Sequence, residues 1–287
     1  MKKFSTVLTI LIVCLLAVSI YKYKNPPAQE SITFFPIDPK VNFIKTETIL
    51  SPLNKPTNFI LWTIHSTLDQ KAYLRQDAGL LFANGRLTGQ LSDWKQNTAA
   101  LIQDDQIATE KSTLLQAITF HHAELHEKGD QIFSSQAMSA DQLYVVHSNP
   151  FKTFRVPSNK NEEQWKQQLD AETERMLQLS WNNGIRYFSI PLKNYEVLPF
   201  SQFHERAKTT LPGFSKPETA RIVGNLWEGL YKNYILGIKK ADGTIITPLG
   251  STIPLILLAK DKTHLLVLTE TGKGEPILLR QIIEEAD

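Results

Sequence analysis

The strongest constraint on this chain is an uncharged run of 18 residues, Phe4 to Tyr21, which lysines flank on both sides. A helix of that length rises roughly 27 Å, which is enough to cross the hydrocarbon core of a bilayer. The run therefore predicts a membrane anchor over residues 1–24, with the membrane itself as the partner of residues 4–21. The alternative is a secretory signal peptide that is cleaved near Ser19. The lysines on both flanks and the apolar residues that continue past Ser19 favour the uncleaved anchor.

The two lysines at the very start place the N-terminus in the cytoplasm by the positive-inside rule. Residues 25–287 are then extracytoplasmic. The only cysteine, Cys14, lies within the apolar run, so the exported part has no disulfide and must be stabilised by its core. Residues 25–57 contain six prolines, which favour an extended juxtamembrane linker.

The charge of the exported part excludes one class of partner. Four of the 31 basic residues lie in residues 1–24, where no acidic residue occurs, which leaves 27 basic residues against 29 acidic ones. No cluster of lysine and arginine with interleaved aromatic residues is present, and nucleic-acid binding requires such a cluster. We therefore expect no nucleic-acid partner.

Residues 58–150 have the pattern of a mainly β region. Apolar and polar residues alternate around Asn84 and Gly85, a pair that is typical of a tight hairpin turn. A second hairpin is expected between residues 114–126 and 131–138, across a turn that contains Gly129. No long helical pattern interrupts the region, which predicts an antiparallel meander of about six strands.

Residues 151–287 change to a mixed pattern. Apolar residues at helical spacing predict a first helix that ends at Gly184, followed by a strand over residues 185–192. Ser215 and Glu218 have the spacing of a capping box, which marks the start of a second helix. Three or four further strands follow. The chain is therefore predicted to be α+β, with a β-meander region and then two main helices packed on an antiparallel sheet.

The densest group of reactive side chains is "HHAELHE", His121 to Glu127. On a strand, His122, Glu124 and His126 share one face, and His121 points to the other. Two imidazoles and a carboxylate are ligands that suit a transition metal. However, residues four apart on a strand are about 13 Å apart at the backbone, which is too far for one ion without a bulge. The pattern therefore favours a solvated strand face near a hairpin tip, with the three residues as weak metal candidates.

Trp227, Tyr231 and Tyr234 share a helical face and offer a second candidate site, a platform for sugar. The competing interpretation is that they pack the helix against the sheet, and it is favoured because aromatic residues dominate cores. No nucleophile motif of the G-x-S-x-G type occurs, and the single cysteine lies in the predicted anchor. No catalytic residue and no cofactor is therefore predicted.

These observations favour a non-enzymatic, single-pass membrane protein of a bacterial envelope. Its extracytoplasmic part would bind an envelope protein or cell-wall material. The alternative is an envelope metal-dependent hydrolase that uses His122, Glu124 and His126.

Overall fold

The longest strand, β2 (Phe59–Ala83), takes part in two layers of one antiparallel sheet. Its first half pairs with β1 (Phe43–Pro52) and its second half with β4 (Thr113–His126). β3 (Arg86–Ala108) pairs with both halves, but the register shifts between Thr67 and Ala72. An irregularity of this kind bends a strand and increases its twist. We call residues 68–71 the bend of β2.

The sheet curls so that a first layer, which contains β1 and the first half of β2, lies over a second layer, which contains the second half of β2 and β4. β5 (Ile132–Val146) and β6 (Lys152–Phe154) extend the order to β1-β2-β4-β5-β6, with β3 on the other side of β2. The Thr48 hydroxyl of β1 lies within hydrogen-bond distance of Thr119 and Ser139, on β4 and β5. The layers approach closely at Gly79, where an added Cβ would lie 2.4 Å from Ile64. Apolar side chains fill the space between the layers, namely Leu50, Ile60, Trp62, Ile64, Leu81, Leu115, Ala117, Leu143 and Val145.

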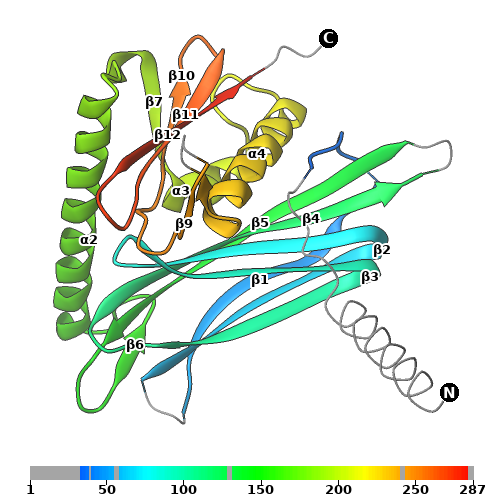
Figure 1. The fold of residues 1–287 in the computed structure, drawn as a ribbon. Coiled ribbons are helices and arrows are strands. Elements are labelled where there is room, and N and C mark those ends of the chain that lie inside the picture. The colour runs from blue at the N-terminus through cyan, green and yellow to red at the C-terminus, as the bar shows by residue number, and fades with distance from the viewer. Residues whose placement is uncertain (1–32, 39, 55–57, 128–130, 240–242, 284–287) are drawn as a thin grey trace, which may run out of the picture. The chain divides into compact units, whose positions relative to one another are not determined.

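Helices and a smaller sheet cover the other face of β2 and β4 (Figure 1). The helices are α2 (Lys160–Tyr187), α3 (Phe200–Lys208) and α4 (Lys216–Leu230), and α4 continues into the π-helix η2 (Tyr231–Ile235). The smaller sheet has the order β12-β11-β10-β7, from β7 (Tyr195–Pro199), β10 (Leu255–Ala259), β11 (His264–Glu270) and β12 (Pro276–Ile282). The remaining elements are η1 (Leu192–Asn194), β8 (Ile238–Lys239) and β9 (Ile245–Ile246).

The structure is a computed structural model that describes residues 33–38, 40–54, 58–127, 131–239 and 243–283. These belong to one compact unit, Ser31–Asp287. No helix in the described ranges is long and apolar enough to cross a membrane. The predicted anchor, residues 4–21, lies outside them and stays a prediction.

The predicted α+β class and the antiparallel pairing are confirmed. The turn at Asn84 and Gly85 is present, with φ of 47° and 78°, and it joins β2 to β3. The Ser215 hydroxyl accepts from the Glu218 N–H, and the Glu218 carboxylate accepts from the Ser215 N–H, which completes the capping box of α4. β4 and β5 pair as expected, although the turn residues 128–130 lie outside the described ranges.

Several local predictions were wrong. Residues 185–192 are not a strand, because α2 continues to Tyr187. Gly184 lies inside that helix, where an added Cβ would be 2.7 Å from Leu268, so the glycine allows close packing rather than ending the helix. Residues 43–52, within the predicted linker, form β1. The meander has four long strands rather than six, and β4 pairs with β2 instead of its chain neighbour β3.

Candidate binding cleft

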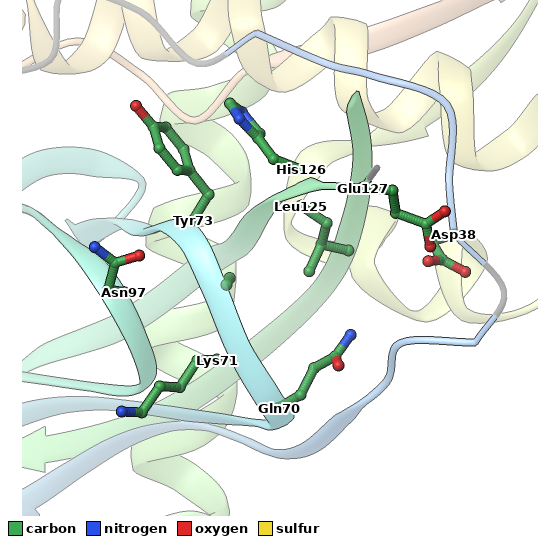
Figure 2. A pocket seen from close by; sticks show the side chains of 9 residues that line it. Asp38, Gln70, Lys71, Tyr73, Asn97, Leu125, His126 and Glu127 are labelled. Carbon is green, nitrogen blue, oxygen red and sulfur yellow. The ribbon is translucent and has the colours of Figure 1, made fainter. Parts of the chain in front are cut away.

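A cleft of about 400 Å³ opens at the bend of β2 (Figure 2). The bend interrupts the pairing of β2 with β3, and on β3 the opposing Asn97 takes a left-handed conformation with φ of 53°. Asparagine tolerates this conformation better than other residues that carry a Cβ. The cleft is lined by residues of four segments, namely Asp38, Gln70, Lys71, Ala72, Tyr73, Asn97, Leu125, His126 and Glu127.

The cleft combines an apolar floor with an aromatic wall. Ala72 and Leu125 are 2% and 5% exposed and belong to a small apolar cluster beneath the cleft. Tyr73 is 43% exposed, and its ring stacks on that of His126 with 3.8 Å between centroids and 14° between planes. The His126 ring is held in turn by a hydrogen bond to Glu124. The aromatic wall is therefore ordered before any ligand arrives.

The rim of the cleft is polar and carries both signs of charge. Gln70, Lys71 and Asn97 are exposed, so their side chains are open to solvent. Figure 2 shows Asp38 and Glu127 together on one side of Leu125 and Asn97 on the other. The Asp38 carboxylate accepts a hydrogen bond from the Lys40 N–H at 2.8 Å, which fixes its position. The cleft thus offers donors and acceptors around an apolar centre.

The residues of the H-x-E-x-H pattern divide between the cleft and the core. His126 lines the cleft and Glu124 bonds to it, but His122 is only 1% exposed. Its ring is stacked with Phe120, with 6.1 Å between centroids, against the α4 side of the sheet. In the part of the chain that the structure describes, no group of three or more His, Cys, Asp or Glu side chains is arranged to hold a metal ion.

The interpretation of this stretch as a solvated strand face was wrong for its two leading histidines. His121 is fully buried between the layers, where it contacts Asp77 and Ser139. His122 points to the opposite face, as the strand period predicts. Both faces of β4 are covered, one by the first layer of the sheet and the other by helices. The alternation of side chains along β4 therefore does not separate a solvent-exposed face from a buried one.

A buried polar network, which sequence reasoning did not find, lies between the layers beneath the cleft. Arg75 is 0% exposed and donates to three elements: to the Ala99 carbonyl at 2.6 Å, to the Ser66 hydroxyl at 2.5 Å and to the His122 carbonyl at 3.3 Å. Its guanidinium also lies 3.5 Å from the Asp77 carboxylate and 4.8 Å from the centroid of the Phe43 ring. We call Ser66, Arg75, Asp77, His121, Ser139 and Thr48 the polar network.

Three members of the polar network have the order of a catalytic triad. His121 Nε2 lies 2.7 Å from Ser139 Oγ, and His121 Nδ1 lies 3.0 Å from Asp77 Oδ2. The second contact is not aligned as a hydrogen bond. Ser139 is 8% exposed, and the Thr48 hydroxyl lies 2.6 Å from its oxygen, so the would-be nucleophile is enclosed by β1. The arrangement therefore joins β1 to β4 and β5 rather than serving a substrate.

On the other face of the sheet, a row of polar residues, two buried and one half-buried, crosses three strands. Gln76, His122 and Gln136 are in register on β2, β4 and β5. Burial, and to a smaller extent the charge of the nearby Arg75, lower the pKa of His122 to about 4, although Asp77 opposes the shift. His122 is therefore neutral near pH 7. Gln136 donates to the Ala220 carbonyl of α4 at 2.7 Å, which ties the row to that helix.

The aromatic residues proposed as an alternative sugar platform are core residues. Trp227, Tyr231 and Tyr234 are exposed by 2% or less. Trp227 stacks on Phe120 of β4, and the Tyr234 hydroxyl donates to the Thr252 carbonyl at 2.8 Å. The interpretation of these residues as packing between helix and sheet is confirmed.

No family model matches the sequence, and no curated protein or solved structure matches it either.

Proposed function

We propose that this chain is a single-pass membrane protein of a bacterial envelope, whose extracytoplasmic unit binds an envelope partner through the cleft at the bend of β2. The observation that carries the proposal is the cleft itself, which joins an ordered aromatic wall, an apolar floor and an open polar rim. Binding sites of small ligands and of partner side chains share these features. The uncharged run Phe4–Tyr21 supports the anchor, and the absence of cysteine beyond it suits an exported unit without disulfides.

A binding role also agrees with the state of the reactive side chains. The Ser139, His121 and Asp77 side chains are buried and contact one another inside the core, and His122 is covered by helices. The side chains that remain open to solvent around the cleft offer hydrogen bonds and one stacked aromatic pair. Such groups suit the recognition of a ligand.

The proposal is tested by photocrosslinking of the full-length chain in living cells. A photoreactive phenylalanine analogue replaces Tyr73 in the cleft, and in a matched control it replaces Tyr187, which is 70% exposed on α2. We expect light-dependent adducts with an envelope component from position 73 at several times the yield from position 187. Equal yields from the two positions, at equal expression, would refute the assignment of the cleft.

A further inference from the structure

The chemistry of the cleft indicates which class of partner it binds. We infer that the cleft is a saccharide-binding site for neutral or amino sugars, with Tyr73 as the stacking residue and the rim as the source of hydrogen bonds. This inference rests on the proposed function and makes it more specific. A sugar ring has an apolar face of C–H groups and an edge of hydroxyl groups, so it needs an apolar surface surrounded by donors and acceptors.

The floor and wall of the cleft match the face of a sugar ring. Ala72 and Leu125 are small or aliphatic and present no polar atom from their side chains. Tyr73 adds an aromatic surface, and its stacking on His126 at 3.8 Å restricts the rotation of its ring. Because His126 is itself bonded to Glu124, little side-chain entropy remains to be lost when a ligand binds. An aromatic residue held in this way is a typical anchor at binding sites.

The rim matches the edge of a sugar ring. A hydroxyl group both donates and accepts, and so it is best served by neighbours of both kinds. The amides of Gln70 and Asn97 provide a donor and an acceptor each, Lys71 provides donors, and Asp38 and Glu127 provide acceptors. A wholly apolar ligand would leave the side chains of Gln70, Asn97 and Glu127 without ligand partners, at a cost for each one that becomes buried.

The charge of the rim selects among saccharides. Two carboxylates, Asp38 and Glu127, stand against one ammonium group, Lys71, because His126 is paired with Glu124. An anionic ligand such as a phosphate-bearing or uronic-acid polymer would meet this excess of negative charge. A neutral sugar meets no repulsion, and a free amino group would be attracted to the carboxylates.

Binding is measured by isothermal titration calorimetry on the full-length chain in detergent micelles. The probes are a tetramer of N-acetylglucosamine, its partly deacetylated form with free amino groups, and an oligomer of galacturonic acid as the anionic probe. We expect the first two to bind with Kd at or below about 1 mM, and the deacetylated form to bind more tightly. The anionic probe is expected to bind at least tenfold more weakly.

Variants separate the cleft from the rest of the surface. We expect Tyr73→Ala to weaken binding at least tenfold, and Tyr73→Phe, which keeps the ring, to weaken it less than threefold. Gln70→Ala should weaken binding a few-fold. Tyr187→Ala, which removes an exposed tyrosine on α2, should leave Kd unchanged. Melting temperatures within a degree of the wild type show that each variant is folded.

The inference would be overturned if no saccharide bound at millimolar concentration, or if wild type and Tyr73→Ala bound with equal affinity. Tighter binding of the anionic probe would also overturn it. If the saccharides fail but position 73 still crosslinks to an envelope protein, only the saccharide assignment falls. If position 73 also gives no more adduct than position 187, the proposed function falls with it.

Discussion

Replacing Arg75 by methionine removes the central charge of the polar network but keeps most of the volume of the side chain. The substitution leaves the Asp77 carboxylate buried with the Ser66 hydroxyl, which still donates to it, but without its cation. It also leaves the Ala99 and His122 carbonyls without the hydrogen bonds that Arg75 donates. Both Arg75 and Asp77 are 0% exposed, so water cannot take over these roles.

The expected loss of unfolding free energy is large because Arg75 and Asp77 are fully buried. Removing one partner of a buried ion pair costs about 3–5 kcal/mol. For a unit of this size, 1 kcal/mol shifts the melting temperature by about 2–4 °C, which gives a fall of roughly 6–20 °C for Arg75→Met. The double variant Arg75→Met/Asp77→Asn removes both charges, and it should recover at least half of the lost stability.

Urea unfolding of the full-length chain in micelles, followed by tryptophan fluorescence, measures the loss. The matched control is Arg155→Met, because Arg155 also pairs with a carboxylate, that of Asp141, but its side chain is 49% exposed. An exposed pair contributes about 0.2–1 kcal/mol. If Arg75→Met costs no more than Arg155→Met, or if the double variant loses the sum of its single losses, the polar network does not stabilise the fold as described.

Three further predictions concern the core and the N-terminal segment. The pKa of His122 is lowered to about 4, whereas an unfolded histidine titrates near pH 6.5, so the unfolded chain takes up this proton first as the pH falls. The free energy of unfolding should therefore fall by about 3 kcal/mol between about pH 6.5 and about pH 4. Urea midpoints across this range should fall less steeply for His122→Leu, and an unchanged slope would contradict the assignment of His122 as buried and neutral. Gly224→Ala should destabilise the unit by about 1–3 kcal/mol and increase proteolysis near Phe34, because the added Cβ would lie 2.0 Å from the Phe34 ring. The matched control is Gly229→Ala in the same helix, whose Cβ would meet nothing within 4 Å, and it should be neutral or stabilising. Gly79→Ala should cost about 1–3 kcal/mol in the same urea assay, since its Cβ would lie 2.8 Å from the Trp62 ring, and a cost below 0.5 kcal/mol would argue against close contact of the two sheet layers.

The features that the sequence predicted correctly depend on neighbouring residues. The Asn84–Gly85 turn and the Ser215 capping box are fixed by residues within three positions of each other. The opposite directions of His121 and His122 follow from the period of a strand, whatever covers it. These local rules hold because they need no knowledge of the rest of the chain.

The features that were missed depend on residues far apart. The bend of β2 and the pairing of β4 with β2 place Arg75, Asp77 and His121 together between two layers. In the sequence, Arg75 and Asp77 are alternate polar residues of a strand, a pattern that is typical of a solvent-exposed face. The cleft was missed for the same reason, because Tyr73, Asn97 and His126 come from three strands. His126 and Glu127, at the end of the reactive stretch His121 to Glu127, are cleft residues to which the sequence did draw attention.

The proposed function requires that the folded unit lie outside the cytoplasm, and one labelling measurement tests this directly. Cys14 is the only native cysteine, so Cys14→Ser removes all background, and Val156→Cys then places a single thiol at a position that is 79% exposed. A membrane-impermeant maleimide is added to intact protoplasts, with a cytoplasmic protein of known exposed thiol as the control for leakage. We predict complete labelling at position 156 before lysis. Labelling that occurs only after lysis would place the unit in the cytoplasm and contradict the account.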